Sequence, residues 1–154
     1  MKTYIFNHSM LGVILGLSIL GCTEGDKFDY NKNMAFITGT ETTPVTKFVV
    51  EDTPSSYAVT ASTTDKVDKD VNVKFAIDRS LVETYNNEHN TKYYAIPEGA
   101  VTLEDADAVI QAGKAFSTPA TVKVISTEDF AEGRVYVVPV TMVEVDGLEI
   151  LKPS

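Results

Sequence analysis

Residues 71–78 read VNVKFAID and decide the fold class of this 154-residue chain. Val71, Val73, Phe75 and Ile77 occupy every second position, and polar or small residues stand between them. Successive side chains of a β-strand point to opposite faces of a sheet. The alternation therefore predicts a strand with one face buried and the other in water.

Other segments with strand-like patterns lie on both sides of this one. Residues 121–125 repeat the alternation, and residues 134–143 are apolar on both faces, which predicts a central strand. Within that run, Pro139 cannot donate a ladder hydrogen bond, so we expect a bulge or a local edge there. Shorter candidates are residues 34–37, 47–50, 57–61 and 148–151. Many short strands separated by turns predict an all-β sandwich.

One helix is expected among the strands. Residues 80–83 read SLVE, the spacing of a capping box, in which the serine caps the first turn and the glutamate reaches back. Leu81, Val82 and Tyr85 would then share an apolar flank. The helix should end around residues 86–87, because asparagine is a poor helix former. Residues 104–110 are interpreted as strand or turn, since Gly113 follows closely.

The N-terminus carries an export signal. A basic residue at position 2, an apolar run at 11–20 and Gly21 before the cysteine are typical of a secretory signal peptide. Residues 18–22, SILGC, resemble the bacterial lipobox, in which the cysteine is acylated and becomes the mature N-terminus. We therefore expect residues 1–21 to be a lipoprotein signal peptide and Cys22 to carry lipid. A retained membrane anchor would need about 20 apolar residues, and a free buried thiol does not explain the motif.

The segment after Cys22 indicates where the protein is displayed. Residues 23–26, TEGD, resemble the surface-export signal of Bacteroidetes lipoproteins. We therefore predict an outer-membrane lipoprotein that is exposed at the cell surface. The lipid on Cys22 would hold it in the membrane. Residues 22–33 are polar and aperiodic, as in a flexible tether. A net charge of −9 argues against a nucleic-acid partner, because nucleic-acid binding depends on basic surfaces.

A family resemblance is carried by several short motifs in a fixed order. These are residues 73–78 (VKFAID), 81–82 (LV), 85–86 (YN), 93–94 (YY), 96–97 (IP), 109–114 (VIQAGK) and 136–140 (YVVPV). Together they resemble a family of Bacteroidetes surface lipoproteins, the domain of unknown function 1735, over most of residues 34–145. The resemblance implies an immunoglobulin-like antiparallel β-sandwich with one short helix, at the N-terminus of proteins linked with polysaccharide utilisation. It implies no catalytic residue and no cofactor.

The chain departs from that family at its end. Members continue past a similar Leu-Lys-Pro-Ser segment into another strand and a further domain, whereas this sequence stops at Ser154. We therefore expect residues 34–154 to be a β-sandwich that lacks a C-terminal strand or a following domain, or else a minimal member. A missing strand would leave a sheet edge open for pairing.

Candidates for catalysis and metal binding are weak in this sequence. His89 stands among polar residues at a helix end, where a surface position is expected, and no spacing suggests a Ser-His-Asp triad. Acidic residues gather at 65–70 and 104–107, but neither group has the spacing of a calcium loop. We interpret both as turn-forming acidic loops and predict neither a catalytic site nor a metal site.

A sugar would need an aromatic platform with polar neighbours. Tyr93 and Tyr94, together with Asn86 and Asn87, are the candidates for glycan binding. Because adjacent strand residues point to opposite faces, at most one of the two tyrosines should be exposed.

The sequence therefore predicts a non-catalytic, lipid-anchored surface module: a structural or spacer domain of a glycan-capture lipoprotein, with a glycan or an outer-membrane transport protein as partner. The alternative is an adhesion or fimbria-like subunit whose open sheet edge accepts a partner strand. A fragment of a glycosidase is a third, weaker interpretation.

Overall fold

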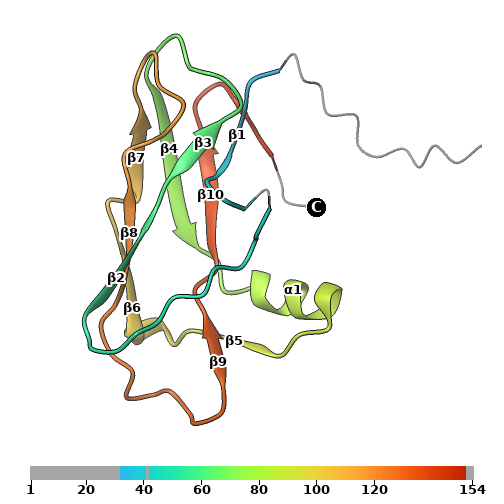
Figure 1. Ribbon diagram of the computed structural model, residues 1–154, viewed down its shortest axis with the longest axis vertical. Coiled ribbons are helices and arrows are strands. Elements are labelled where there is room, and N and C mark those ends of the chain that lie inside the picture. The colour runs from blue at the N-terminus through green and yellow to red at the C-terminus, as the bar shows by residue number, and fades with distance from the viewer. Residues whose placement is uncertain (1–31, 41, 152–154) are drawn as a thin grey trace, which may run out of the picture.

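The computed structural model describes residues 32–40 and 42–151, which form strands, one α-helix and one 3-10 helix (Figure 1). The strands of this part form three three-stranded sheets and one two-stranded sheet. The first sheet has the order β11 (Glu149–Ile150), β1 (Met34–Ile37), β3 (Ala61–Thr63), and the second has the order β10 (Val140–Val145), β4 (Val71–Ile77), β7 (Asp107–Ile110). The third sheet has the order β2 (Ser55–Val59), β8 (Ala120–Val124), β6 (Val101–Glu104). The two-stranded sheet pairs β5 (Tyr93–Ala95) with β9 (Val135–Val137). The helices are α1 (Leu81–His89) and η1 (Glu98–Ala100).

Strand β4 is the centre of its sheet and lies where the alternation predicted a strand. Val71, Val73 and Phe75 are buried, while Asn72 and Lys74 face water. Antiparallel partners flank it on both sides, with Phe75 opposite Met142 of β10 and Val73 opposite Ala108 of β7. The predicted strand is therefore confirmed, with its apolar face toward the core.

Strand β8 is the centre of a second sheet, between β2 and β6, and confirms the strand predicted at 121–125. Its buried residues are Ala120, Val122 and Val124. The inward side chains of this sheet meet those of the β4 sheet in one hydrophobic core, in which Phe75, Ile110 and Val73 are the largest fully buried side chains.

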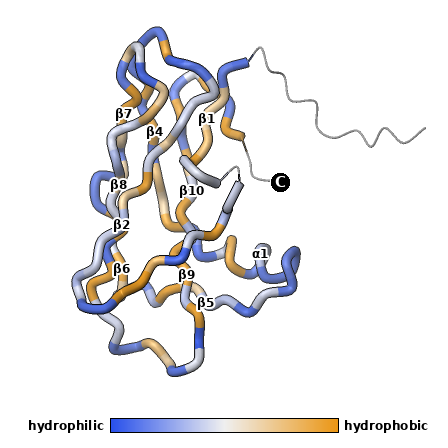
Figure 2. Tube along the Cα trace, in the orientation of Figure 1, coloured by the Kyte–Doolittle hydropathy of each residue, from blue (hydrophilic) through white to orange (hydrophobic). Residues whose placement is uncertain are grey.

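Hydropathy along the chain follows this arrangement. Hydrophilic residues dominate the last turn of α1 and the loop at the top of the molecule, whereas apolar residues gather in the strands (Figure 2). The predicted all-β sandwich with one short helix is confirmed.

Two strand pairs differ from a purely antiparallel sandwich. β1 pairs in parallel with β11, with Met34 opposite Glu149, and β5 pairs in parallel with β9, with Tyr94 opposite Tyr136. Parallel neighbours need long connections between them. Each pair therefore joins parts of the chain that lie far apart in the sequence.

The single central strand predicted at 134–143 is wrong. The run divides into β9 and β10, which belong to different sheets, and β10 flanks β4 on one side of its sheet. Pro139 stands at the break; its carbonyl oxygen accepts a hydrogen bond from Asp78 N (2.9 Å), but its nitrogen has no hydrogen to donate. The bulge lies further on, where the register shifts between Met142 and Glu144 and leaves Val143 54% exposed.

The strand predicted at 47–50 is also wrong. This segment forms no ladder, yet Phe48 and Val50 pack against the core from outside the sheets. Phe48 contacts the ring of Tyr57 in β2, with 5.6 Å between ring centroids. Phe48 and Val50 are partly buried by an irregular segment that crosses the sandwich, while Val49 between them is 62% exposed (Figure 1).

The interpretation of residues 104–110 as strand and turn is confirmed. β6 ends at Glu104, the chain turns through Asp105, and β7 starts at Asp107. Asp105 has φ +52°, a left-handed conformation that aspartate tolerates better than most residues.

Helix α1 begins at the predicted place, but a different residue caps it. Ser80 has helical angles, φ −65° and ψ −25°, and its side chain makes no capping hydrogen bond. The carboxylate of Asp78 instead accepts hydrogen bonds from Ser80 N (3.0 Å) and Ser80 Oγ (2.6 Å). The helix continues past residues 86–87 to His89 and ends at Asn90, which is left-handed with φ 52°. Only Val82 of the expected apolar flank is fully buried.

Candidate functional site

The sequence candidates for glycan binding gather at the two-stranded β5–β9 sheet, beside α1 at the lower end of the sandwich (Figure 1). Side chains alternate across the two strands, so Tyr93 and Val135 share one face, and Tyr94 and Tyr136 share the other. Helix α1 packs on the first face, where the ring of Tyr85 stacks on that of Tyr93. The two tyrosines of the YY motif therefore lie in different environments.

Asn86 is fully engaged in holding the chain together at this point. Its Nδ2 donates to Tyr93 O (2.9 Å), and its Oδ1 accepts from Tyr93 N (2.9 Å) and from Thr91 Oγ1 (2.8 Å). The next hydrogen bond from β5 toward β9 is donated by Ile96 N to Val137 O (3.0 Å). The side-chain amide of Asn86 thus bonds both backbone groups of Tyr93, as a neighbouring strand would. It joins α1 to β5 on the side of β5 that faces away from β9.

Tyr93 and Asn87 occupy different positions around that junction. Tyr93 is half-buried, its ring centroid 6.0 Å from that of Tyr85, and Tyr85 in turn lies 4.1 Å from the ring of His89. Asn87 is exposed on the helix. As the alternation predicted, only one of the two tyrosines is exposed, and that residue is Tyr94.

Tyr94 belongs to a stack of groups that the sequence did not reveal. Its side chain is 41% exposed, and the guanidinium carbon of Arg134 lies 4.5 Å from its ring centroid. The ring of Tyr136 follows at 6.0 Å from Tyr94, and the ring of Phe130 stacks on Tyr136 at 4.4 Å. We refer to Arg134, Tyr94, Tyr136 and Phe130 as the Arg-aromatic stack.

The loop before β9 fixes the position of this stack. Ala131 N donates to the hydroxyl oxygen of Tyr136 (3.0 Å), and Arg134 N donates to Ala131 O (3.4 Å). Gly133 has φ +76°, a conformation that a residue with a Cβ rarely adopts. A tight turn therefore delivers Arg134 onto the ring of Tyr94. Arg134 and Phe130 were missed because periodicity carries no sign of the parallel β5–β9 pairing.

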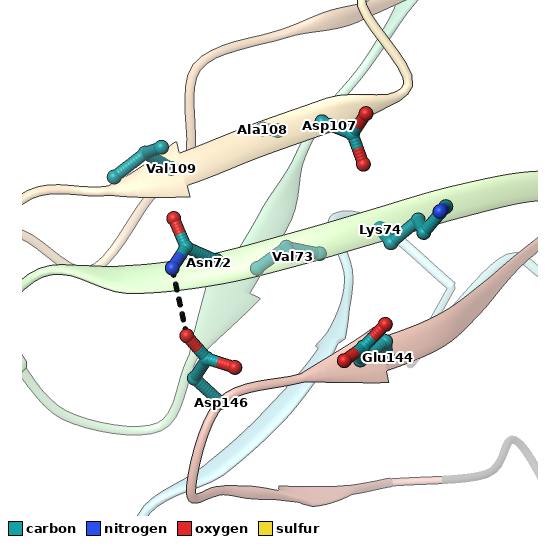
Figure 3. Close-up of a pocket in the computed structure, with 8 residues that line it drawn as sticks. All are labelled: Asn72, Val73, Lys74, Asp107, Ala108, Val109, Glu144 and Asp146. Carbon is teal, nitrogen blue, oxygen red and sulfur yellow. Dashed lines mark hydrogen bonds between the residues drawn. The ribbon is translucent and has the colours of Figure 1, made fainter.

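A separate surface hollow lies on the outer face of the β4 sheet, with a volume of about 360 Å³ (Figure 3). Lys74 of β4 stands between Asp107 of β7 and Glu144 of β10, and Asn72 Nδ2 donates to Asp146 Oδ2 (2.7 Å). None of the four glycan-binding candidates lines this hollow. Its charges alternate in sign across the strands, a cross-strand pattern that stabilises a sheet by about 0.2–1 kcal/mol per pair.

The acidic groups at 65–70 and 104–107 lie partly in turns and partly in strands, since Glu104 and Asp107 belong to β6 and β7. Asp65 Oδ1 accepts from Lys66 N (2.7 Å), and Asp70 Oδ1 accepts from Ala112 N (2.8 Å). In the part of the chain that the structure describes, no three His, Cys, Asp or Glu side chains come together as a group that could hold a metal ion. Glu104 instead pairs with Lys123 of the neighbouring strand β8 (3.2 Å), so the turn-forming role expected from the sequence applies to only part of the two groups.

The lipidation candidate Cys22 and most of the tether at 22–33 lie outside the described residues. Over residues 32–40 and 42–151, no helix has both the length and the apolar character needed to cross a bilayer.

Comparison with known proteins gives one family and several similar folds. A family model described as "-like, N-terminal domain" matches residues 30–149. No curated protein matches the chain.

Solved structures from Bacteroides share the fold. One is a provisionally named carbohydrate-binding protein of Bacteroides ovatus ATCC 8483, with TM-score 0.61 and 20% identity, over 68% of this chain and 30% of that one. Another is a two-domain protein of unknown function from Bacteroides fragilis NCTC 9343, with TM-score 0.54 and 13% identity, over 80% and 43%. A third is a multidomain protein including the domain of unknown function 1735 from Bacteroides ovatus, with TM-score 0.52 and 15% identity, over 71% and 40%. The chain spans less than half the length of each.

Proposed function

This chain belongs to the domain of unknown function 1735 family, a family of N-terminal domains, and from that membership we propose that it is a non-catalytic surface module. In this proposal the sandwich is a structural or spacer domain of a glycan-capture lipoprotein, and the lipid on Cys22 anchors it in the outer membrane. The observation that carries the proposal is the family match over residues 30–149 to an N-terminal domain.

The length of the similar structures supports a modular role. Each of the three Bacteroides proteins contains this fold in 30–43% of its own chain, so the fold occurs there as one part of a larger protein. One of them is described as carbohydrate-binding. A module of a glycan-capture protein is consistent with both facts.

The path of the chain through the sandwich also supports a spacer. β1 and β11 are parallel neighbours, with Met34 opposite Glu149, and Leu151 N donates to Ala35 O (2.8 Å). Lys32 pairs with Glu149 at the same edge. Because the two strands run in one direction, the chain arrives from one end of this edge and leaves toward the other. An in-line module between an anchor and a partner needs such a path.

A strain in which the sandwich is exchanged tests the spacer role. The gene is deleted, or residues 34–151 are replaced by an unrelated immunoglobulin-like domain of similar size, and growth is measured on a panel of polysaccharides. We expect the deletion to impair growth on at least one polysaccharide. We expect the domain exchange to restore growth on uncharged polysaccharides. Unimpaired growth after deletion would contradict glycan capture, and an exchange as defective as the deletion would contradict a spacer.

Metabolic labelling with palmitate tests the anchor. We expect the wild-type protein to take up label and the Cys22→Ala variant to take up none, because the thiol is the acylated group. Antibody binding to intact cells then reports whether the sandwich faces outward. Equal label in the two proteins would show that the lipoprotein interpretation is wrong.

A further inference from the structure

The chain contains two arginines, Arg79 and Arg134, and the structure uses them differently. Arg79 is half-buried, and its Nε donates to Ile96 O (3.0 Å). Arg134 is exposed and stacks on Tyr94, and within residues 32–40 and 42–151 its side chain has neither a hydrogen bond nor an ion pair. One arginine is thus part of the framework, and the other has its N–H groups free.

Free N–H groups on Arg134 are unexpected in so acidic a chain. Its own loop carries Glu128, Asp129 and Glu132, all exposed, and none of them pairs with the guanidinium. The cation instead lies over the ring of Tyr94, a contact that engages none of its N–H groups in a hydrogen bond to the described residues. A planar fork of donors is therefore presented beside a half-exposed aromatic ring.

These features fit one class of ligand. An arginine fork binds a carboxylate through two parallel hydrogen bonds, and the exposed part of Tyr94 supplies an apolar surface with a hydroxyl at its tip. The three acidic side chains of the loop would repel a polyanion such as a nucleic acid or an anionic membrane surface. A molecule with a single negative charge is repelled far less than a polyanion, because its one charge lies on the guanidinium and it has no further charges near the acidic side chains.

We propose that the Arg-aromatic stack binds an oligosaccharide that is neutral except for one acidic sugar, with that sugar's acidic group on Arg134 and a pyranose ring against Tyr94. This inference does not depend on the lipid anchor or on the spacer role. A protein that binds such a sugar without serving glycan capture would pass the binding test below and fail the growth test above.

The binding test uses the full-length protein in mild detergent, with sialyllactose as the probe and lactose as the matched neutral sugar. One charge-assisted pair and one ring contact correspond to a dissociation constant on the order of 1 mM. We expect sialyllactose to bind at least about ten-fold more tightly than lactose. Lactose 3'-sulfate distinguishes a carboxylate from a sulfate as the preferred acidic group.

Nuclear magnetic resonance gives a direct readout at the site. The Nε–H signal of Arg134 should shift as sialyllactose is added, whereas that of Arg79 should stay in place because its donor is already bonded to Ile96 O. The second arginine is thus an internal control. If neither signal moves at up to about 20 mM sugar, or if both move equally, the proposed site is wrong.

Substitutions test the roles of the two side chains. Arg134→Gln should weaken sialyllactose binding by at least about ten-fold, and Arg134→Lys should weaken it less, because lysine keeps the charge but lacks the fork. Tyr94→Ala should also weaken binding. Lys92→Gln removes an exposed cation just before β5 and serves as the matched control, with affinity unchanged.

Three further results would overturn the proposal. The first is an Arg134→Gln variant that folds normally by circular dichroism and binds sialyllactose as tightly as the wild type does. Lys92→Gln could weaken binding as much as Arg134→Gln does, which would indicate general electrostatic attraction. Finally, a glutamate-containing tripeptide could bind as tightly as sialyllactose, which would show that the site recognises a carboxylate without its sugar.

Discussion

At the scale of single residues, neighbours of the same type have different roles. Asn86 makes three hydrogen bonds that close the loop between α1 and β5, whereas Asn87 points into solvent. Both were glycan-binding candidates on sequence grounds, because an asparagine near an aromatic residue looks the same whether its amide is free or used. The structure leaves the amide of Asn87 exposed and commits that of Asn86 to the backbone of Tyr93.

Substitution of these two asparagines measures that difference. Asn86→Ala should lower the free energy of unfolding by about 1–3 kcal/mol, since it leaves polar groups of Tyr93 without partners. Asn87→Ala should change it by less than about 0.5 kcal/mol. Urea unfolding of both variants provides the comparison, and equal effects would contradict the bridging role of Asn86.

At the scale of elements, the start of α1 shows how a motif can predict the right helix through the wrong contact. The SLVE spacing predicted a capping box at Ser80 and Glu83, and a helix does begin at Leu81. The cap is formed two residues earlier, where Asp78 accepts the hydrogen bonds of Ser80. An aspartate before a helix can satisfy the orphan donors as well as a serine can.

The two capping schemes make opposite predictions. Asp78→Ala should destabilise the protein by about 1 kcal/mol, because the acceptor for Ser80 is lost. Glu83→Gln should cost less than about 0.5 kcal/mol. Thermal unfolding of the two variants at equal concentration provides the measurement. A larger loss of stability for Glu83→Gln than for Asp78→Ala would show that the capping box, and not Asp78, stabilises the start of the helix.

At the scale of the whole molecule, stability depends on the core shared by the β4 and β8 sheets. Phe75 is buried at its centre, while Phe116 is 62% exposed at the surface. The alternation identified Phe75 as inward-facing, because its strand pattern places it with Val71 and Val73. No such pattern surrounds Phe116, whose position depends on how the chain returns toward β8.

Two truncations of the same residue type test this assignment. Phe75→Ala should cost about 3–5 kcal/mol, through lost burial and a residual cavity. Phe116→Ala should stay within about 0.5 kcal/mol of the wild type. Equilibrium denaturation gives both values, and if Phe75→Ala does not unfold at lower denaturant than Phe116→Ala, the core assignment is wrong.

Local patterns were sufficient for most elements and insufficient for their arrangement. Strands β4 and β8 were predicted because alternation reports which side chains are buried, whatever lies opposite them. The break at Pro139 was expected as a local disturbance, but its consequence, a change of sheet between β9 and β10, depends on which strands are available as partners. The segment containing Phe48 was mistaken for a strand because burial by an irregular segment leaves the same apolar signature.

The sequence by itself determined the class of fold, the inward faces of β4 and β8, the start of α1 and the exposure of only one residue of the Tyr93–Tyr94 pair. These properties follow from side-chain periods that repeat within a few residues. Only the tertiary structure decided the parallel pairings of β1 with β11 and of β5 with β9, the bridging by Asn86 and the stacking of Arg134 on Tyr94. Those contacts join residues distant in the chain, and their geometry is set by how the whole chain packs around its core.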